Sequence, residues 1–173
     1  MTIRMNDRRI VLVGFMGCGK TSVAEALAHH LGCEMVDLDS FIIKRETRSP
    51  AEIIEQDGES AFRDLESLAL RDVLQARSVR IVALGGGTWT IPANRTLVAL
   101  HECLSVWLDA PFEVCWDHIS ENREANRPLA PDRDTAEIRY RSRRADYALA
   151  DERIVANPGE SSEIIAKKIL AQT

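Results

Sequence analysis

The chain has 173 residues, of which 45% are hydrophobic and 28% are charged. This length and composition are typical of one globular domain with a sizeable core. The net charge of −5 argues against a general surface for nucleic acid or anionic membranes. No apolar run reaches the length of a membrane span.

The ends and the cysteines add expectations about location and partners. The opening residues, MTIRMNDRRI, lead directly into a strand-like run, so we expect no signal peptide. The cysteines have no metal-like spacing, and we expect reduced thiols in a cytoplasmic protein. Nothing in the sequence requires a partner chain, so we expect a monomer.

The first half of the chain starts with a short apolar run, Ile10–Val13, which predicts a buried strand. Lys20–Leu31 has apolar residues at helical spacing and predicts a helix, with Gly32 as its C-cap. Glu34–Leu38 predicts a second strand. A helical region follows, Ser40–Gln75, with interruptions near Ser49–Pro50 and at Gly58.

The second half predicts three more strands, Val79–Leu84, Ser105–Leu108 and Ile154–Ala156. A charged segment with several prolines, Asp117–Asp134, lies between the last two. The chain closes with a predicted helix over about 161–171, capped by Ser161 or Ser162.

Strands that alternate with helices predict an α/β fold, in which helices sandwich a mostly parallel sheet. Ligands of such sheets bind at the carboxyl ends of the strands. The first three predicted strands are followed by GFMGCGKTS, by Asp37–Leu38–Asp39 and by Gly85–Gly86–Gly87. We therefore expect these three stretches to meet at one edge of the sheet.

GFMGCGKT fits the phosphate-binding pattern G-x-x-x-x-G-K-[ST] at every fixed position, between a strand and a helix. Its glycines let backbone N–H groups curl around a phosphate at the start of a helix. Lys20 would reach the β- and γ-phosphates of a nucleotide, and the Thr21 hydroxyl would hold Mg²⁺. A chance glycine-rich turn is the alternative. The predicted nucleotide- and phosphate-binding residues of this loop are Gly14, Gly17, Cys18, Gly19, Lys20, Thr21 and Ser22.

Two acidic residues, Asp37 and Asp39, suggest a metal-binding site and a site for a phosphate acceptor. Strand alternation would place Asp37 and Asp39 on one side of the sheet. One could serve Mg²⁺ through water and the other could orient an acceptor hydroxyl. A solvated strand end, with Asp39 or Ser40 as an N-cap, is the alternative.

Arginines supply the cationic candidates. Arg63 and Glu66 share a helix face, which indicates either a surface ion pair or an arginine held to grip a substrate carboxylate. Arg127 precedes a proline, and a mobile loop could deliver it to a transferring phosphoryl group. Its neighbours are expected to be ordinary helix charges. The histidines, His29, His30, His101 and His118, show no metal-ligand or triad spacing and are expected to be structural or surface residues.

The combination of these stretches resembles shikimate kinase, a relative of the nucleoside monophosphate kinases. The matching pieces are GFMGCGKTS, DLDSF, GESAFRDLE, LGGG with NR at 94–95, NRPLA and RRADY, in the order and approximate spacing of the family. Together they span residues 10 to about 156. The phosphate-binding loop is shared by many proteins, whereas the other pieces in this order are much more specific.

The resemblance implies one kinase domain over 1–173, with a five-stranded parallel sheet in the order 2-3-1-4-5. It implies an acceptor-binding helical region over about 40–75 and a lid over about 117–134. The implied reaction is Mg²⁺-dependent transfer of the γ-phosphoryl group of ATP to the 3-hydroxyl of shikimate.

The resemblance also implies roles for particular residues. Asp39 would bind the substrate hydroxyls and accept the proton, and Lys20 and Arg127 would neutralise the transferring phosphate. Asp37 and Thr21 would serve Mg²⁺. The implied shikimate-binding residues are Asp39, Arg63, Gly85, Gly86, Gly87 and Arg143.

Several positions depart from the family pattern, and two of these departures concern the predicted pockets. Ser120 stands where the family often has an arginine near adenine, and a bulky Trp89 follows the glycines, where it would change the pocket wall. The three glycines are interpreted as a backbone that a substrate approaches because no Cβ intervenes, with a flexible turn as the alternative.

Two other functions stay open at this point. A kinase of another hydroxylated metabolite, such as gluconate, would use the same fold, and the pairing of Arg63, Arg143 and Asp39 argues against it. A degraded, non-catalytic nucleotide-binding protein is the other, and the presence of Lys20 and Arg127 argues against that.

Overall fold

A computed structural model of the chain describes residues 8–76, 78–121 and 129–172. Its strands are all parallel and form one sheet in the order β2-β3-β1-β4-β5, which confirms the predicted fold class and strand order. The strands are β1 (Ile10–Val13), β2 (Glu34–Asp37), β3 (Val79–Ala83), β4 (Leu104–Asp109) and β5 (Glu152–Val155).

Helices connect these strands, and a short 3₁₀ turn, η2 (Thr88–Thr90), follows β3. The helices are α1 (Lys20–Leu31), α2 (Leu38–Glu46), α3 (Pro50–Asp57), α4 (Glu59–Gln75), α5 (Pro92–Leu100), α6 (Phe112–Glu121), α7 (Arg133–Tyr147) and α8 (Ser162–Gln172).

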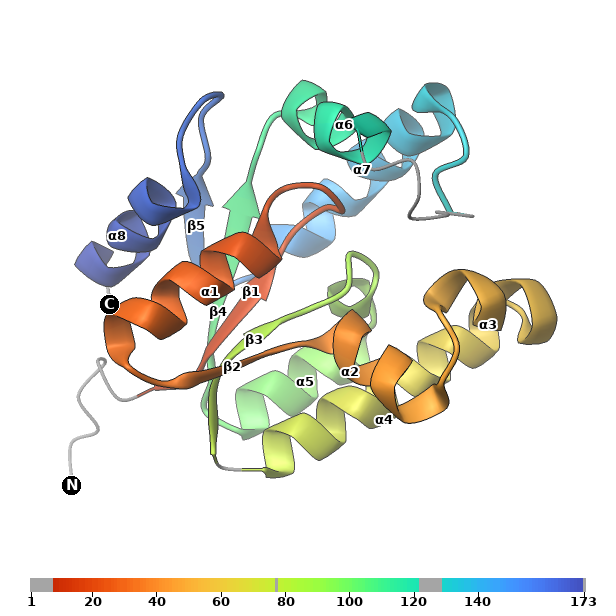
Figure 1. Ribbon diagram of the computed structural model, residues 1–173, viewed down its shortest axis with the longest axis horizontal. Coiled ribbons are helices and arrows are strands. Elements are labelled where there is room, and N and C mark those ends of the chain that lie inside the picture. The colour runs from red at the N-terminus through yellow and green to blue at the C-terminus, as the bar shows by residue number, and fades with distance from the viewer. Residues whose placement is uncertain (1–7, 77, 122–128, 173) are drawn as a thin grey trace.

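The helices lie in layers on the two faces of the sheet. α1 and α8 pack against each other on one face, whereas α4 and α5 pack together on the other (Figure 1). β1 is central, with Ile10 opposite Ile81 of β3 and Leu104 of β4, and all four of its residues are buried. This burial on both faces explains why β1 is continuously apolar.

The local predictions in the first half of the chain are confirmed, with one change. Gly32 ends α1 at a φ of 58°, where its N–H bonds the last turn of the helix. Ser49 and Glu52 form a capping box at the start of α3. The second strand ends at Asp37, one residue early, because the Asp37 carboxylate accepts the Ser40 N–H and caps α2.

Three helices were not predicted from the sequence: α5, α6 and α7. In α7 the buried residues are Ala136, Arg143 and Tyr147, so an apolar pattern at helical spacing is missing. The predicted charged segment, Asp117–Asp134, begins inside α6 and ends inside α7. Residues 122–128 of this segment, and with them Arg127, lie outside the described residues.

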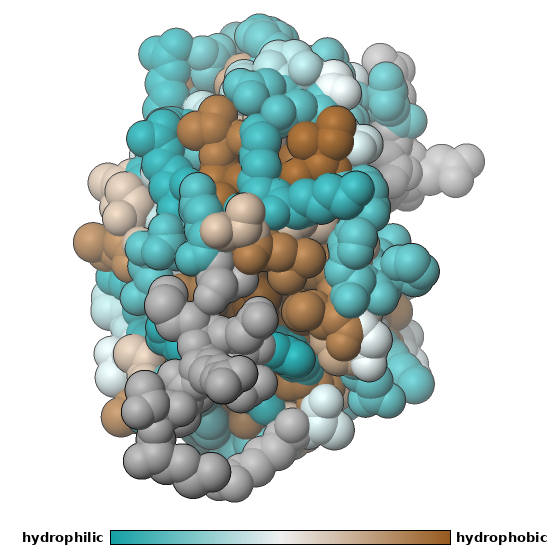
Figure 2. Space-filling view, turned by 90° about the vertical axis from the view of Figure 1, so that its left-hand side faces the viewer, coloured by the Kyte–Doolittle hydropathy of each residue, from teal (hydrophilic) through white to brown (hydrophobic). Residues whose placement is uncertain are grey.

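On the side of the molecule where α8 lies, groups of apolar residues are separated by hydrophilic ones (Figure 2). Within the described ranges, no helix combines the length and the apolar character that a membrane crossing needs.

Candidate active site

The loop between β1 and α1 has the backbone of a phosphate cradle. Gly14, Gly17 and Gly19 all have positive φ values, which L side chains rarely adopt. A Cβ on Gly14 would lie 2.8 Å from the Leu108 carbonyl oxygen, and one on Gly17 would meet the backbone carbonyl of Cys115 in α6. β4 and α6 therefore pack closely against the loop at Gly14 and Gly17, where both conformation and space require glycine, whereas at Gly19 the conformation alone requires it.

Lys20 lies folded onto this loop. Its Nζ donates hydrogen bonds to the carbonyl oxygens of Gly14 and Phe15, both at 2.8 Å. An entering phosphate would offer the ammonium group a charged acceptor in place of these neutral carbonyls, and charge-assisted hydrogen bonds are the stronger ones. The geometry therefore fits a phosphate-binding lysine.

Thr21 and Asp37, the residues predicted to serve a metal, are in contact. The Thr21 hydroxyl donates to Asp37 Oδ2 at 2.6 Å, and Asp37 Oδ1 accepts the Ser40 N–H at 2.9 Å. Hydroxyl and carboxylate oxygens are ligands that Mg²⁺ accepts. Among the described residues, no group of three or more His, Cys, Asp or Glu could hold a metal on its own. The pair fits Mg²⁺ only when phosphate oxygens and water complete the coordination, as is usual for this ion.

A hollow of about 350 Å³ lies beside the loop, and we call it the nucleotide pocket. It brings the loop together with the end of β2, the glycines after β3 and one residue of α6. It is lined by Met16, Gly17, Gly19, Lys20, Thr21, Ser22, Asp37, Asp39, Leu84, Gly86 and His118.

His118 is the polar side chain of this pocket that the sequence analysis did not assign to the site. Its Nδ1 lies 2.7 Å from the Gly17 carbonyl oxygen. Since a carbonyl only accepts, Nδ1 carries the proton in this contact. A correct assignment of α6 as a helix would have been the one available signal, because His118 lies one turn after Cys115, which packs on Gly17.

A second hollow, of about 260 Å³, adjoins the first, and we call it the acceptor pocket. It is lined by Met16, Asp39, Ile43, Pro50, Ala51, Ile54, Phe62, Arg63, Glu66, Gly85, Gly86, Gly87, Leu129 and Arg143. Asp39 reaches both pockets from the first turn of α2, not from β2. The prediction that strand alternation aligns Asp37 and Asp39 is therefore wrong, although both residues do line the nucleotide pocket. The alternative N-caps, Asp39 and Ser40, are also excluded, because Asp37 is the cap.

Arg63 is held at this pocket by two glutamates of its own helix. Its Nη1 contacts Glu66, and its Nη2 donates to Glu59 Oε1 at 2.9 Å. Glu66 is 1% exposed and also accepts from the Thr88 hydroxyl at 2.7 Å. Burial lowers the pKa of Arg63, but Glu66 and Glu59 outweigh it, so that the pKa lies above its ordinary value. The guanidinium of Arg63 is therefore held in place by Glu66 and Glu59, and the binding of a substrate carboxylate by Arg63 stays a prediction.

Arg143 enters the same pocket from α7 and is 7% exposed. Its pKa is lowered, mainly by burial and further by the positive charges of Arg63 and Arg139. A buried cation beside other cations is stabilised by an incoming anion. Arg63 and Arg143 thus place two guanidinium groups at one hollow, an arrangement that suits an anion.

The three glycines leave room for these side chains. A Cβ on Gly85 would lie 2.5 Å from Glu66 Oε1 and 2.9 Å from Asp39 Oδ1, and one on Gly87 would collide with the Arg63 guanidinium. None of the three has a positive φ, so backbone freedom is not the reason for glycine here. The three glycines thus let the side chains of Glu66, Asp39 and Arg63 lie close to the backbone. The sequence analysis had expected only a substrate to lie close to it.

The glycine stretch and the turn after it are supported from outside the acceptor pocket. The supporting side chains belong to the NR and RRADY pieces, which the sequence analysis used only for the family resemblance. The Tyr147 hydroxyl donates to Gly86 O at 2.6 Å, and Asn94 donates to Thr88 O at 2.9 Å. Arg95 donates to Trp89 O at 2.7 Å. The NR pair at 94–95 therefore supports the turn after the glycines.

Trp89 does not change the wall of the acceptor pocket, contrary to the expectation from the sequence. η2 directs it into the core, where it is 3% exposed and its Nε1 donates to Asp146 O at 3.0 Å. Ser120, at the second departure from the family pattern, donates to Asp117 O within α6.

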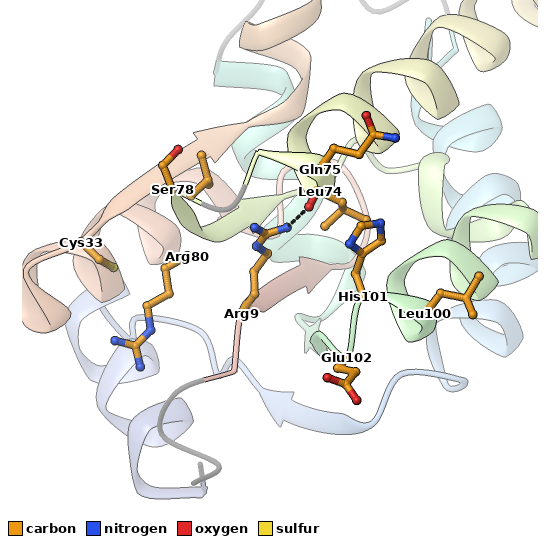
Figure 3. Close-up of a pocket in the computed structure, with 10 residues that line it drawn as sticks. Arg9, Cys33, Leu74, Gln75, Ser78, Arg80, Leu100, His101 and Glu102 are labelled. Atoms are coloured by element: carbon orange, nitrogen blue, oxygen red, sulfur yellow. Dashed lines mark hydrogen bonds between the residues drawn. The ribbon is translucent and has the colours of Figure 1, made fainter. Parts of the chain in front are cut away.

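A larger hollow, of about 800 Å³, shares no lining residue with the nucleotide and acceptor pockets and is drawn in Figure 3. It adjoins the amino ends of β1 and β3. Arg9 lines it but points to the end of α4, where it donates to Leu74 O at 2.8 Å (Figure 3). Size alone therefore does not identify the functional site of this molecule.

The chain is similar to known proteins over almost its whole length. The family model described as shikimate kinase matches residues 16–173. A shikimate kinase of Geobacter sulfurreducens is 40% identical, covering 98% of this chain and 92% of the relative, and one of Ruegeria pomeroyi is 35% identical, covering 95% and 84%. A structure of shikimate kinase from Acinetobacter baumannii in complex with shikimate superposes with a TM-score of 0.88 at 31% identity, covering 95% of this chain and 92% of that one. A gluconokinase from Sinorhizobium meliloti 1021 has a TM-score of 0.66 at 17% identity over 97% and 92% of the chains, a likeness of fold alone.

Proposed function

The chain belongs to the shikimate kinase family and is an ATP-dependent kinase of shikimate; we propose that its two pockets divide this reaction between nucleotide and acceptor. The observation that carries the division is that Asp39 and Gly86 line both pockets. A γ-phosphate on one side and an acceptor hydroxyl on the other can meet there in line, which phosphoryl transfer requires.

On the nucleotide side, the backbone N–H groups from Gly14 to Ser22 would bind the phosphates, with the start of α1 adding its dipole. Lys20 would leave the loop carbonyls and neutralise charge on the transferring group. Thr21 and Asp37 would hold Mg²⁺, which supplies positive charge to the phosphates when bound. Arg127 lies outside the described residues, so its role in neutralising the transferring phosphate stays a prediction.

On the acceptor side, Arg63 and Arg143 would bind the carboxylate of shikimate, because a fixed guanidinium and a buried cation face the same hollow. Gly85, Gly86 and Gly87 would let the ring lie close to the backbone. Asp39 would then orient the 3-hydroxyl and accept its proton as the oxygen attacks the γ-phosphorus.

Several wider predictions accompany this assignment. We propose one kinase domain over residues 1–173, with an acceptor-binding region over about 40–75 and a lid over about 117–134. A monomer in the cytoplasm, which binds neither nucleic acid nor membranes, remains the expectation.

The test is shikimate-dependent formation of ADP with Mg²⁺-ATP, measured beside reactions with gluconate and with no acceptor. We expect ADP only with shikimate. ADP formation with gluconate and not with shikimate would mean that the acceptor is a sugar acid in place of shikimate. ATP binding without turnover would support a non-catalytic nucleotide-binding protein.

A further inference from the structure

The Arg63 guanidinium is paired with two carboxylates of the protein, those of Glu66 and Glu59. Of its two partners, Glu66 is buried and held by Thr88, whereas the Glu59 side chain is 44% exposed. Removing Glu66 from Arg63 would leave a buried charge unpaired, which is costly. Glu59 is therefore the partner that can leave Arg63 and remain hydrated.

Arg139 of α7 offers Glu59 a second partner. Its Nη1 lies 3.6 Å from Glu59 Oε1, the same oxygen that accepts from Arg63. Burial raises the pKa of Glu59, but the hydrogen bond from Arg63 and the charges of Arg63, Arg139 and Arg143 outweigh it, so that the pKa lies below its usual range. Glu59 is thus an ionised carboxylate shared between α4 and α7.

Arg143 differs from the other two arginines at this end of the acceptor pocket in its ion pairs. Within the described ranges, no carboxylate oxygen lies at ion-pair distance from Arg143, whereas Arg63 and Arg139 both have Glu59. Arg63 and Arg139 therefore share Glu59, and their positive charges act on Arg143. Asp39, the other acid of this pocket, is assigned to the reacting hydroxyl. A carboxylate from outside would complete the pairing.

We propose that Glu59 is a placeholder for the substrate carboxylate: it occupies Arg63 before shikimate binds and moves to Arg139 when shikimate replaces it. The proposal rests on the proposed binding of the shikimate carboxylate by Arg63. The exchange keeps Arg63 and Glu59 paired before and after binding. It also makes Glu59 a competitor of shikimate, which lowers the apparent affinity by the fraction of Arg63 that Glu59 occupies. Arg139 weakens this competition by holding Glu59 away.

The test is a double-mutant cycle on the KM for shikimate, with the KM for ATP measured in parallel. Glu59→Gln removes the competing charge and should lower the KM for shikimate about two- to fivefold, the range of a partly exposed ion pair. Arg139→Gln should raise it by a similar factor. Arg139→Gln in the Glu59→Gln background should have no effect, because nothing is left for Arg139 to hold. Glu137→Gln, which removes an exposed ion pair with Arg141 on the same helix, is the control and should change neither KM.

Two results would overturn the proposal. A higher KM for shikimate in Glu59→Gln would mean that Glu59 only supports Arg63. An effect of Arg139→Gln that persists in the double variant would mean that Arg139 acts independently of Glu59. Arg63→Met separates this proposal from the proposed function: a wild-type KM for shikimate in that variant would remove Arg63 from the carboxylate site, whatever the Glu59 variant does.

Discussion

Gly87→Ala is expected to disable the acceptor pocket and leave the nucleotide pocket intact. The new Cβ would collide with the Arg63 guanidinium, whose Nη2 would lie 2.6 Å away. The φ of Gly87 is −99°, so alanine meets no backbone strain at this position. The side chain of Arg63 must therefore move, and the movement breaks its contact with buried Glu66.

The size of the effect follows from the bonds that are lost. A hydrogen bond to a charged group contributes about 1.5–3 kcal/mol, and each 1.4 kcal/mol corresponds to a factor of ten in affinity. We expect the KM for shikimate to rise roughly 10- to 100-fold. Weaker pairing of Glu66 should also cost about 1–3 kcal/mol of the free energy of unfolding. The KM for ATP should stay within about a factor of two, because Gly87 does not line the nucleotide pocket.

Initial rates over a range of both substrates, and urea unfolding of each variant, measure these quantities. Gly159→Ala is the matched control: φ is +80° and nothing lies within 4 Å, so alanine should cost only about 1 kcal/mol of backbone strain, with both KM values unchanged. A folded Gly87→Ala enzyme with the wild-type KM for shikimate would refute the reasoning. Equal increases in both KM values would also refute it.

Three further predictions concern other parts of the molecule. Lys20→Ala should lower turnover at least about a hundredfold, while shikimate still raises the Tm, because Lys20 does not line the acceptor pocket; loss of that Tm shift would contradict the division into two pockets. His118→Ala should raise the KM for ATP about two- to tenfold, and His118→Asn, whose amide can still donate to Gly17 O, should restore most of it; equal values for the two variants would exclude this hydrogen bond as the cause. Glu160→Gln should lessen the loss of stability in acid. Hydrogen bonds from Lys168 and a backbone N–H lower the pKa of Glu160 to about 2, so this carboxylate stabilises the folded state above the usual pKa of Glu and the gain is lost as the pH falls toward 2. Urea midpoints between about pH 6 and pH 3 should therefore fall less steeply in the variant, and parallel curves would show that Glu160 contributes nothing.

The sequence predicted those parts of the fold that are encoded locally. β1 and α1 were assigned with their observed bounds, because an apolar run, a glycine-rich loop and a C-cap glycine lie next to one another in the chain. The phosphate loop needs these neighbours only, so its motif is informative without any knowledge of the rest of the molecule.

The sequence did not predict those features that depend on contacts between residues far apart in the chain or on a single side-chain hydrogen bond. α7 buries Arg143 instead of an apolar residue at its pocket face, so the helix that completes the acceptor site has no apolar stripe. Strand alternation was applied as far as Asp39, although the strand ends at Asp37. The hydrogen bond from the Ser40 N–H to the Asp37 carboxylate ends the strand, and composition does not reveal this bond. His118 reaches Gly17 across about a hundred residues of chain, and no sequence spacing encodes such a contact.

The two kinds of glycine in this site show how one residue type serves different physical needs. In the phosphate loop, positive φ values alone require glycine at Gly19, since nothing lies near its missing Cβ. After β3, ordinary backbone angles would accept any residue, and the requirement comes from Glu66 and Arg63, which occupy the space of the missing side chains. Substitutions at Gly19 should therefore act through the backbone. Substitutions after β3 should act through the charged side chains that bind the acceptor, so changes in Arg63 or Glu66 should modify their effect.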